Sequence, residues 1–169
     1  ACGCWIGWWP TITRTARKAK MTEIAFYHLQ HWPLEKALAK LLELTLERGK
    51  RAVVLLGTPE RVEALNSLLW TFDQDSWLPH GSAQDGEAAL QPVWLTATDE
   101  NPNGARYLFL ADGAASARVG DFDRCFELFD GNDPDAVAQA RARWKAYQDA
   151  GHALAYWQQT EQGGWTRKD

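Results

Sequence analysis

Residues 22–57, TEIAFYHLQHWPLEKALAKLLELTLERGKRAVVLLG, contain two strand patterns separated by a helix pattern. Residues 22–28 are β-branched and aromatic with apolar side chains on both faces, which is typical of a buried strand. From Pro33 to Arg48 the apolar positions recur at helical spacing, and Gly49 suits a C-terminal cap. The continuous apolar run AVVLL then indicates a strand covered on both faces. This order of strand, helix and strand predicts an α/β fold.

The following segments extend this pattern. Thr58 and Pro59 suit the start of a second helix, which we expect to end near Trp70 and Phe72. Residues 73–91 are rich in Asp, Gln, Gly, Ser and Ala, and they predict a long surface loop.

The second half of the chain predicts more strands and a late helix. The expected elements are strands at 92–97, 106–111 and 125–129, a helix from Pro134 to about Gly151 capped by Asn132 or Asp133, and a final strand at 152–159. The strands at 92–97 and 106–111 either form a hairpin or flank a longer crossover, and the tail 160–169 is expected to be frayed. Together these elements predict a three-layer α/β domain.

Charge and hydropathy exclude several classes of protein. The chain has 169 residues, a formal charge of −4 and no block of basic residues in its main body, which argues against direct binding of duplex DNA. No apolar run approaches the roughly 20 residues needed to cross a bilayer, so we expect a soluble protein.

The first twenty residues differ in composition from the remainder. They carry four basic residues and no acid, which leaves residues 21–169 with a charge of −8. Met21 is the only methionine and directly precedes a strand pattern, so we expect it to be the natural start and residues 1–20 to be an upstream-read or expression-derived leader. Cys2, Cys4 and Cys125 lack the spacing of a zinc site, which predicts unpaired thiols and a reducing cytoplasm.

Signals for catalysis are weak. The turn after AVVLL has one glycine and no G-K-[ST], so it lacks both the P-loop and the G-x-G-x-x-G pattern. No G-x-S-x-G motif is present. A nucleotide-dependent or hydrolytic enzyme would have His28, Thr58 and Asp112 as its least implausible participants. Residues of these types more often lie in loops or cap helices than take part in catalysis.

Tryptophans give the strongest binding signal. Residues 21–169 contain seven tryptophans, which is more than one core easily buries. For each individual tryptophan, a buried or half-buried core position is the simpler alternative to a binding role. On the last helix, Arg141, Trp144 and Lys145 fall on one face. An apolar pocket beside cations suits the C-terminus of an acidic peptide, whereas a solvated helix face is the simpler alternative.

Four segments carry a resemblance to a known family: EIAFYHL, RVEALNSLLWTFDQDSWLPHG, QPVWLT and ARARWKAYQDAGHALAYWQQ. Together they resemble the chi subunit of bacterial DNA polymerase III from Met21 to about Trp165. LLWTF followed by SWLPHG is the most specific part. The leader 1–20 has no counterpart in the family.

The resemblance implies a non-catalytic adaptor with a Rossmann-like α/β fold and a largely parallel sheet, without a cofactor or metal. Such an adaptor links the clamp-loader assembly to single-stranded DNA-binding protein by binding its acidic C-terminal tail, which ends in an apolar dipeptide. DNA contact is then mainly indirect. The family also binds a psi subunit, for which no face can be assigned from the sequence.

The family's tail-binding positions fall on Trp70, Trp77, Arg141 and Trp144 in this sequence. A further basic position of the family falls on Val137, for which Arg143 or Lys145 are the candidate replacements. The other alternative is a protein that binds single-stranded nucleic acid directly by stacking bases on the tryptophans. The net negative charge of the chain argues against this alternative.

Overall fold

The computed structural model describes residues 20–73, 75 and 77–168, so residues 1–19 of the expected leader lie outside it. The elements follow in this order: β1 (Glu23–Leu29), α1 (Leu34–Glu47), β2 (Ala52–Leu55), α2 (Pro59–Thr71), β3 (Gly81–Ser82), the 3-10 turn η1 (Ala88–Leu90), β4 (Val93–Thr96), β5 (Tyr107–Leu110), the 3-10 turn η2 (Val119–Asp121), β6 (Arg124–Asp130), α3 (Pro134–Asp149), β7 (Ala153–Gln159) and β8 (Trp165–Lys168).

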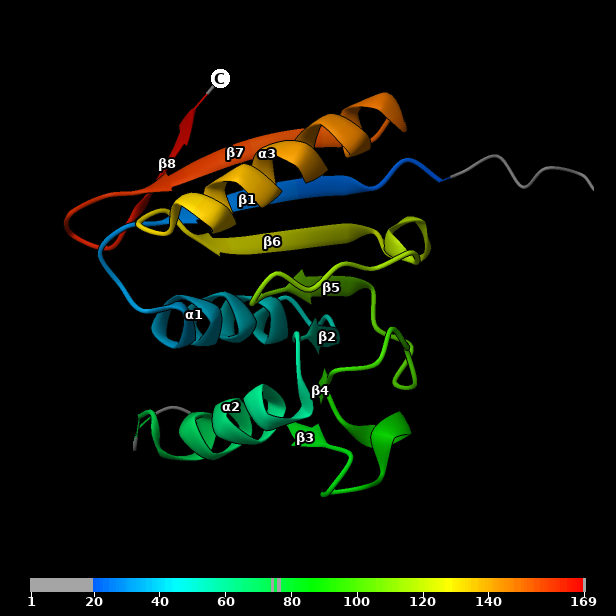
Figure 1. Cartoon of the computed structure of the whole chain (residues 1–169). Helices are drawn as coiled ribbons and strands as arrows, with labels where there is room; N and C mark the ends of the chain where they lie inside the picture. The colour runs from blue at the N-terminus through cyan, green and yellow to red at the C-terminus, as the bar shows by residue number, and fades with distance from the viewer. Residues whose placement is uncertain (1–19, 74, 76, 169) are drawn as a thin grey trace, which may run out of the picture.

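The strands of the described residues form one eight-stranded sheet in the order β3-β4-β2-β5-β6-β1-β7-β8 (Figure 1). Every neighbouring pair is parallel except β7 and β8. The predicted α/β fold with a largely parallel sheet is therefore confirmed.

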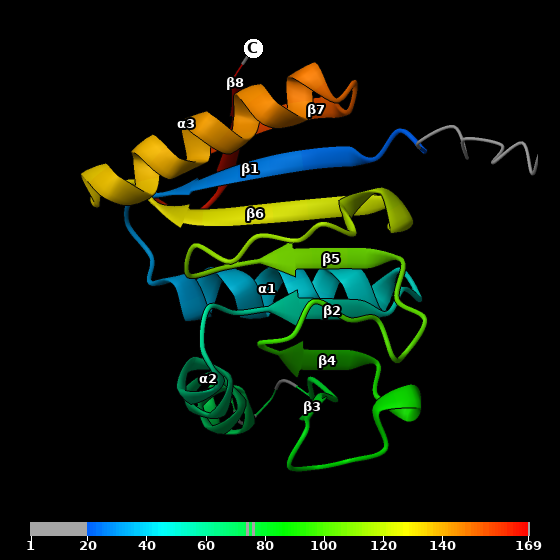
Figure 2. The same ribbon diagram turned by 45° about the vertical axis from the view of Figure 1, so that its right-hand side comes forward.

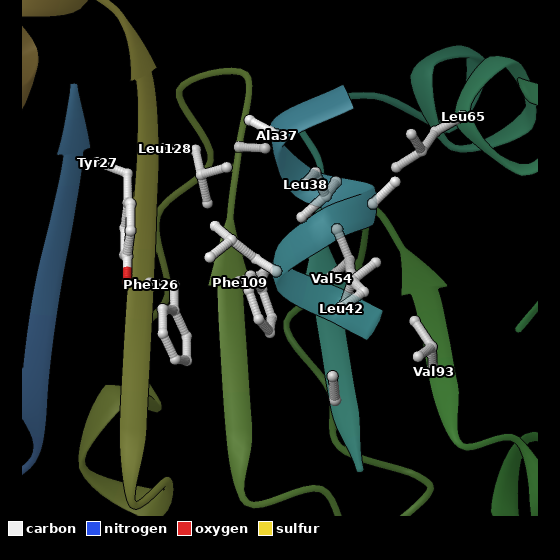
Figure 3. Close-up of a cluster of buried hydrophobic side chains, with 14 of the residues drawn as sticks. Tyr27, Ala37, Leu38, Leu42, Val54, Leu65, Val93, Phe109, Phe126 and Leu128 are labelled. Atoms are coloured by element: carbon white, nitrogen blue, oxygen red, sulfur yellow. The ribbon is translucent and has the colours of Figure 1, made fainter. Parts of the chain in front are cut away.

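The helices divide between the two faces of the sheet (Figure 2). On one face, Leu38 of α1 and Leu65 of α2 join a core with Phe109 of β5, shown in Figure 3. On the other face, Ala140 of α3 packs in a second core with Phe129 of β6. These two cores confirm the three-layer arrangement and place α2 and α3 on opposite sides of the sheet.

The helix starts expected from the sequence are present. The Thr58 hydroxyl accepts a hydrogen bond from the backbone N–H of Arg61 at 3.3 Å, and Asp133 accepts one from the N–H of Asp135 at 2.9 Å. A proline occupies the first turn of both α2 and α3, where its missing N–H costs no helical hydrogen bond.

The segments at 92–97 and 106–111 do not form a hairpin. Their strands β4 and β5 lie on either side of β2 and run parallel to it, so the crossover alternative is confirmed. Within the connection, the buried amide of Asn103 donates to the carbonyls of Ala52 at 3.1 Å and Gln91 at 2.9 Å. These bonds hold the crossover against the start of β2 and satisfy a backbone carbonyl there.

The expectation of a frayed tail is wrong, because residues 165–168 form β8, antiparallel to β7. The Trp165 ring packs edge-on against Tyr27 with 4.8 Å between ring centroids. This long-range aromatic contact orders a segment whose own sequence is mostly polar.

Candidate peptide-binding site

A pocket of about 590 Å³ opens between α3 and the β7–β8 edge of the sheet. Its lining comes from four elements and consists of Phe26, Ala140, Arg141, Trp144, Leu154, Ala155, Tyr156, Arg167 and Lys168. Phe26 lies on β1 and Tyr156 on β7, at positions paired in the parallel register. The pocket therefore combines the sheet as its floor with one edge of α3 as a wall.

Three aromatic rings form the apolar part of this pocket. Trp144 is half-buried and packs edge-on against Phe26, with 5.1 Å between ring centroids. Tyr156 lies edge-on to Trp144 at 6.4 Å. Edge-to-face contacts at these distances hold rings in fixed orientations. A ring or branched apolar side chain of a ligand would thus meet a preformed surface.

A hydrogen bond to His28 orients the tyrosine. The hydroxyl of Tyr156 bonds to Nδ1 of His28. Burial lowers the pKa of His28, which favours the neutral imidazole whose nitrogen can accept the hydroxyl hydrogen. Burial also raises the pKa of Tyr156, an effect that the positive charge of Arg141 opposes. Both groups are therefore uncharged near neutral pH, and the floor of the pocket stays apolar.

The rim of the pocket is basic. Arg141 is exposed on α3, and two basic residues of β8, Arg167 and Lys168, also border the pocket. No acidic side chain of the described residues lines the pocket. Cations beside an aromatic hollow provide charge-assisted hydrogen bonds for a carboxylate next to an apolar side chain.

The structure does not place either candidate replacement for the missing basic residue at Val137 in this pocket. Arg143 instead forms an ion pair with the buried carboxylate of Glu127 on β6. Burial raises the pKa of Glu127 to about 7, although the charge of Arg143 opposes this effect. Lys145 is exposed on α3 but is absent from the residues that line the pocket. Half-buried Val137 packs against the core beneath α3.

Trp70 and Trp77 are not part of this pocket. Trp70 lies on α2, which covers the opposite face of the sheet beside its β3–β4 end (Figure 1), and Trp77 follows α2 and lies beside residues of α1 on that face. Trp70 is 56% exposed, and its ring centroid lies 4.4 Å from that of His80. Trp77 is 83% exposed. Of the four residues predicted to form one site, the structure therefore brings together only Arg141 and Trp144.

The surroundings of Trp77 differ in charge from those of Trp144. Trp77 borders a shallow hollow lined by Lys40, Glu43, Leu46, Glu47, Asp73 and Asp75. The lysine is already within 3.0 Å of Glu43. Four carboxylates against one ammonium make this hollow acidic, so it repels rather than attracts an acidic peptide.

Each residue considered for an enzyme has a structural partner. His28 bonds to Tyr156, Thr58 caps α2, and the Asp112 carboxylate pairs with Arg61 at 2.9 Å. A cleft of about 640 Å³ lies at the carboxyl ends of β1, β5 and β6, the usual ligand position in parallel α/β sheets, but only Asp112 of these three residues lines it. The described residues include no group of His, Cys, Asp or Glu suited to a metal ion.

Two further expectations concern cysteines and membranes. Cys125 is buried and unpaired, whereas Cys2 and Cys4 lie outside the described residues. In the part of the chain that the structure covers, no helix has the length and apolar character to span a bilayer.

Comparison with known families decides the relationship. The family model for the DNA polymerase III chi subunit, HolC, matches residues 21–155, which is most of the chain. The chain belongs to the chi family. A chi-family relative from Rickettsia prowazekii (strain Madrid E), named "Probable DNA polymerase III subunit chi", is 30% identical over 99 residues. This alignment covers 59% of the present chain and 60% of the relative's length.

The chi-family match includes Arg141 and Trp144 but ends before β8. The sequence analysis missed Phe26, Tyr156, Arg167 and Lys168 as pocket residues. For Phe26 and Tyr156 the strand patterns predict that side chains alternate between two faces, but they do not report which face α3 covers. For Arg167 and Lys168 the segment WTRK has the aromatic and basic composition of the site, but the polar sequence around it predicts a frayed tail.

Proposed function

We propose that this chain is an accessory adaptor of DNA polymerase III, which binds the acidic C-terminal tail of single-stranded DNA-binding protein in the pocket between α3 and β7–β8. The chi family supplies the polymerase context. The observation that supports the tail site most strongly is the pairing of three aromatic rings with basic residues from α3 and β8 in one pocket.

The chemistry of the pocket suits the last residues of such a tail. Arg141 can donate two parallel hydrogen bonds to the terminal carboxylate. The last apolar side chain then fits against Phe26, Trp144 and Tyr156, where it leaves water. Recognition of a free C-terminus in this way requires both the carboxylate and the side chain, which gives specificity for the chain end.

In this proposal the protein acts by binding and not by catalysis. Single-stranded DNA is contacted mainly through the DNA-binding protein, since residues 21–169 carry a charge of −8. Trp77 belongs to a second surface, the acidic hollow beside α1 on the other face of the sheet. An adaptor needs two surfaces that can be occupied together, and this second one suits an apolar and basic segment of a psi or clamp-loader subunit.

The tail site is tested by calorimetric titration of the full chain with a peptide of aspartates followed by an apolar dipeptide and a free carboxylate. We expect a micromolar Kd, and we expect Arg141→Ala and Trp144→Ala each to weaken binding about tenfold. Trp77→Ala is the matched control and should leave the Kd within about twofold. Equal losses for Trp77→Ala and Trp144→Ala would contradict the assignment of the tail to the α3 pocket.

A further inference from the structure

The C-terminal hairpin holds β8 firmly beside the pocket. The N–H of Gly164 donates to the Thr160 hydroxyl at 3.0 Å, and the N–H of Thr160 donates to the carbonyl of Gly164 at 2.9 Å. Trp165 anchors the strand on Tyr27. The position of β8 is therefore set by a closed turn and by an aromatic contact with β1.

The register of this hairpin separates its two cations. Lys168 is paired with Tyr156, and Arg167 is paired with Trp157. Side chains of directly opposed residues lie on the same face of a sheet, and successive residues alternate. Tyr156 belongs to the core under α3, whereas Trp157 packs on the core under α1. The register therefore directs the Lys168 side chain to the face that carries the pocket and the Arg167 side chain to the other face, so Arg167 borders the pocket without facing into it.

Among the described residues, Arg141 is the one basic residue that α3 contributes to the pocket lining. One turn earlier on the helix, Val137 is apolar and packs on the core. Lys168 comes from a different element, β8, which lines the pocket together with α3. Two cations from different elements can serve two separate negative groups of one peptide, the terminal carboxylate and an acidic side chain before it.

We propose that Lys168 of β8 is a second anion-binding residue of the pocket, which contacts an acidic side chain upstream of the terminal carboxylate and makes the site prefer acidic over neutral tails. This inference rests on the proposed function and deepens it. The β8 strand lies beyond the residues that the family model matches. In this proposal Lys168 provides a basic group that Val137 does not provide on α3.

The test compares two peptides with the same apolar dipeptide and free carboxylate, one with aspartates before it and one with asparagines. Their Kd values are measured for the unsubstituted full chain and for Lys168→Ala, Arg167→Ala and Arg141→Ala. We expect Lys168→Ala to weaken binding of the aspartate peptide about threefold and to leave the asparagine peptide within about 1.5-fold. Lys168→Arg should retain the preference, and Arg141→Ala should weaken both peptides.

Arg167→Ala is the matched control, because it removes the same charge from the neighbouring residue on the other face. An equal loss with Arg167→Ala would show a general charge effect and overturn the role of Lys168. The role of Lys168 is also overturned if Lys168→Ala changes neither Kd, or if it changes both Kd values equally. If the unsubstituted chain binds the aspartate peptide normally while Lys168 has no role, the proposed function stands. Failure of the unsubstituted chain to bind either peptide would overturn the proposed function and this inference together.

Discussion

At the scale of single residues, charge placement decides which tryptophan can serve an acidic ligand. Trp77 is far more exposed than Trp144, yet the hollow beside it contains four carboxylates. Trp144 is half-buried, and its pocket has a basic rim. Exposure alone therefore identifies Trp77 as a contact surface, whereas the neighbouring charges determine the kind of partner it accepts.

Glu127 provides a residue-scale prediction about stability. Its pKa of about 7 in the folded protein lies above the usual 4.5, so the folded state holds this proton more tightly than the unfolded chain does. The free energy of unfolding that Glu127 contributes is therefore fully present below pH 4.5 and is lost as the pH rises to about 7. The loss corresponds to about 3 kcal/mol for this shift.

Urea unfolding of the unsubstituted protein and of Glu127→Gln over this pH range measures that loss. The glutamine variant cannot titrate at this position, so the difference in unfolding free energy between the two proteins should change with pH as stated. A difference that is constant from about pH 4 to about pH 8 would show that Arg143 cancels the effect of burial.

At the scale of elements, the hairpin that joins β7 to β8 depends on one glycine. Gly163 has a φ of +81°, and a Cβ at this position would meet the indole ring of Trp32. We expect Gly163→Ala to lower the free energy of unfolding by about 2 kcal/mol, because the left-handed backbone and the clash both cost energy.

Gly151→Ala is the control for this variant, since Gly151 has a φ of +84° and open space around it. It isolates the backbone cost of about 1 kcal/mol. Equal effects of the two substitutions would mean that Trp32 moves aside freely and that this side of the hairpin is loosely packed.

The elements also show how far the sequence alone can lead. Helices with strong periodicity and strands with continuous apolar runs were predicted correctly, because burial on one or two faces leaves a direct pattern in the sequence. The strand β8 was missed, since its order comes from Trp165 packing on Tyr27, which is distant in sequence. Arg141 and Trp144 were placed together by helical spacing, but no local pattern reports that α2 and α3 cover opposite faces.

At the scale of the whole molecule, the net negative charge of the chain and the positive charge around the pocket act in opposite directions on an acidic peptide. Residues 21–169 carry a charge of −8, so an acidic tail is repelled at long range and attracted only near the pocket. The attraction acts over a few ångströms between partly exposed groups, which salt screens. We therefore expect the tail peptide to bind several-fold more weakly at about 300 mM than at about 50 mM NaCl.

Titrations at several salt concentrations check this expectation, with Arg141→Ala as the comparison. The variant should show a shallower salt dependence, because one of the cations is gone. Binding that strengthens with salt in both proteins would mean that net repulsion dominates and that the basic rim contributes little.

The most direct test of the central claim is to follow the tryptophan indole N–H signals of the full chain by NMR while the acidic tail peptide is added. If the pocket between α3 and β7–β8 holds the peptide, the Trp144 signal shifts saturably with the same Kd as in calorimetry, and the Trp70 and Trp77 signals stay in place. Shifts confined to Trp70 and Trp77, with Trp144 unchanged, would contradict the account and move the tail to the opposite face of the sheet.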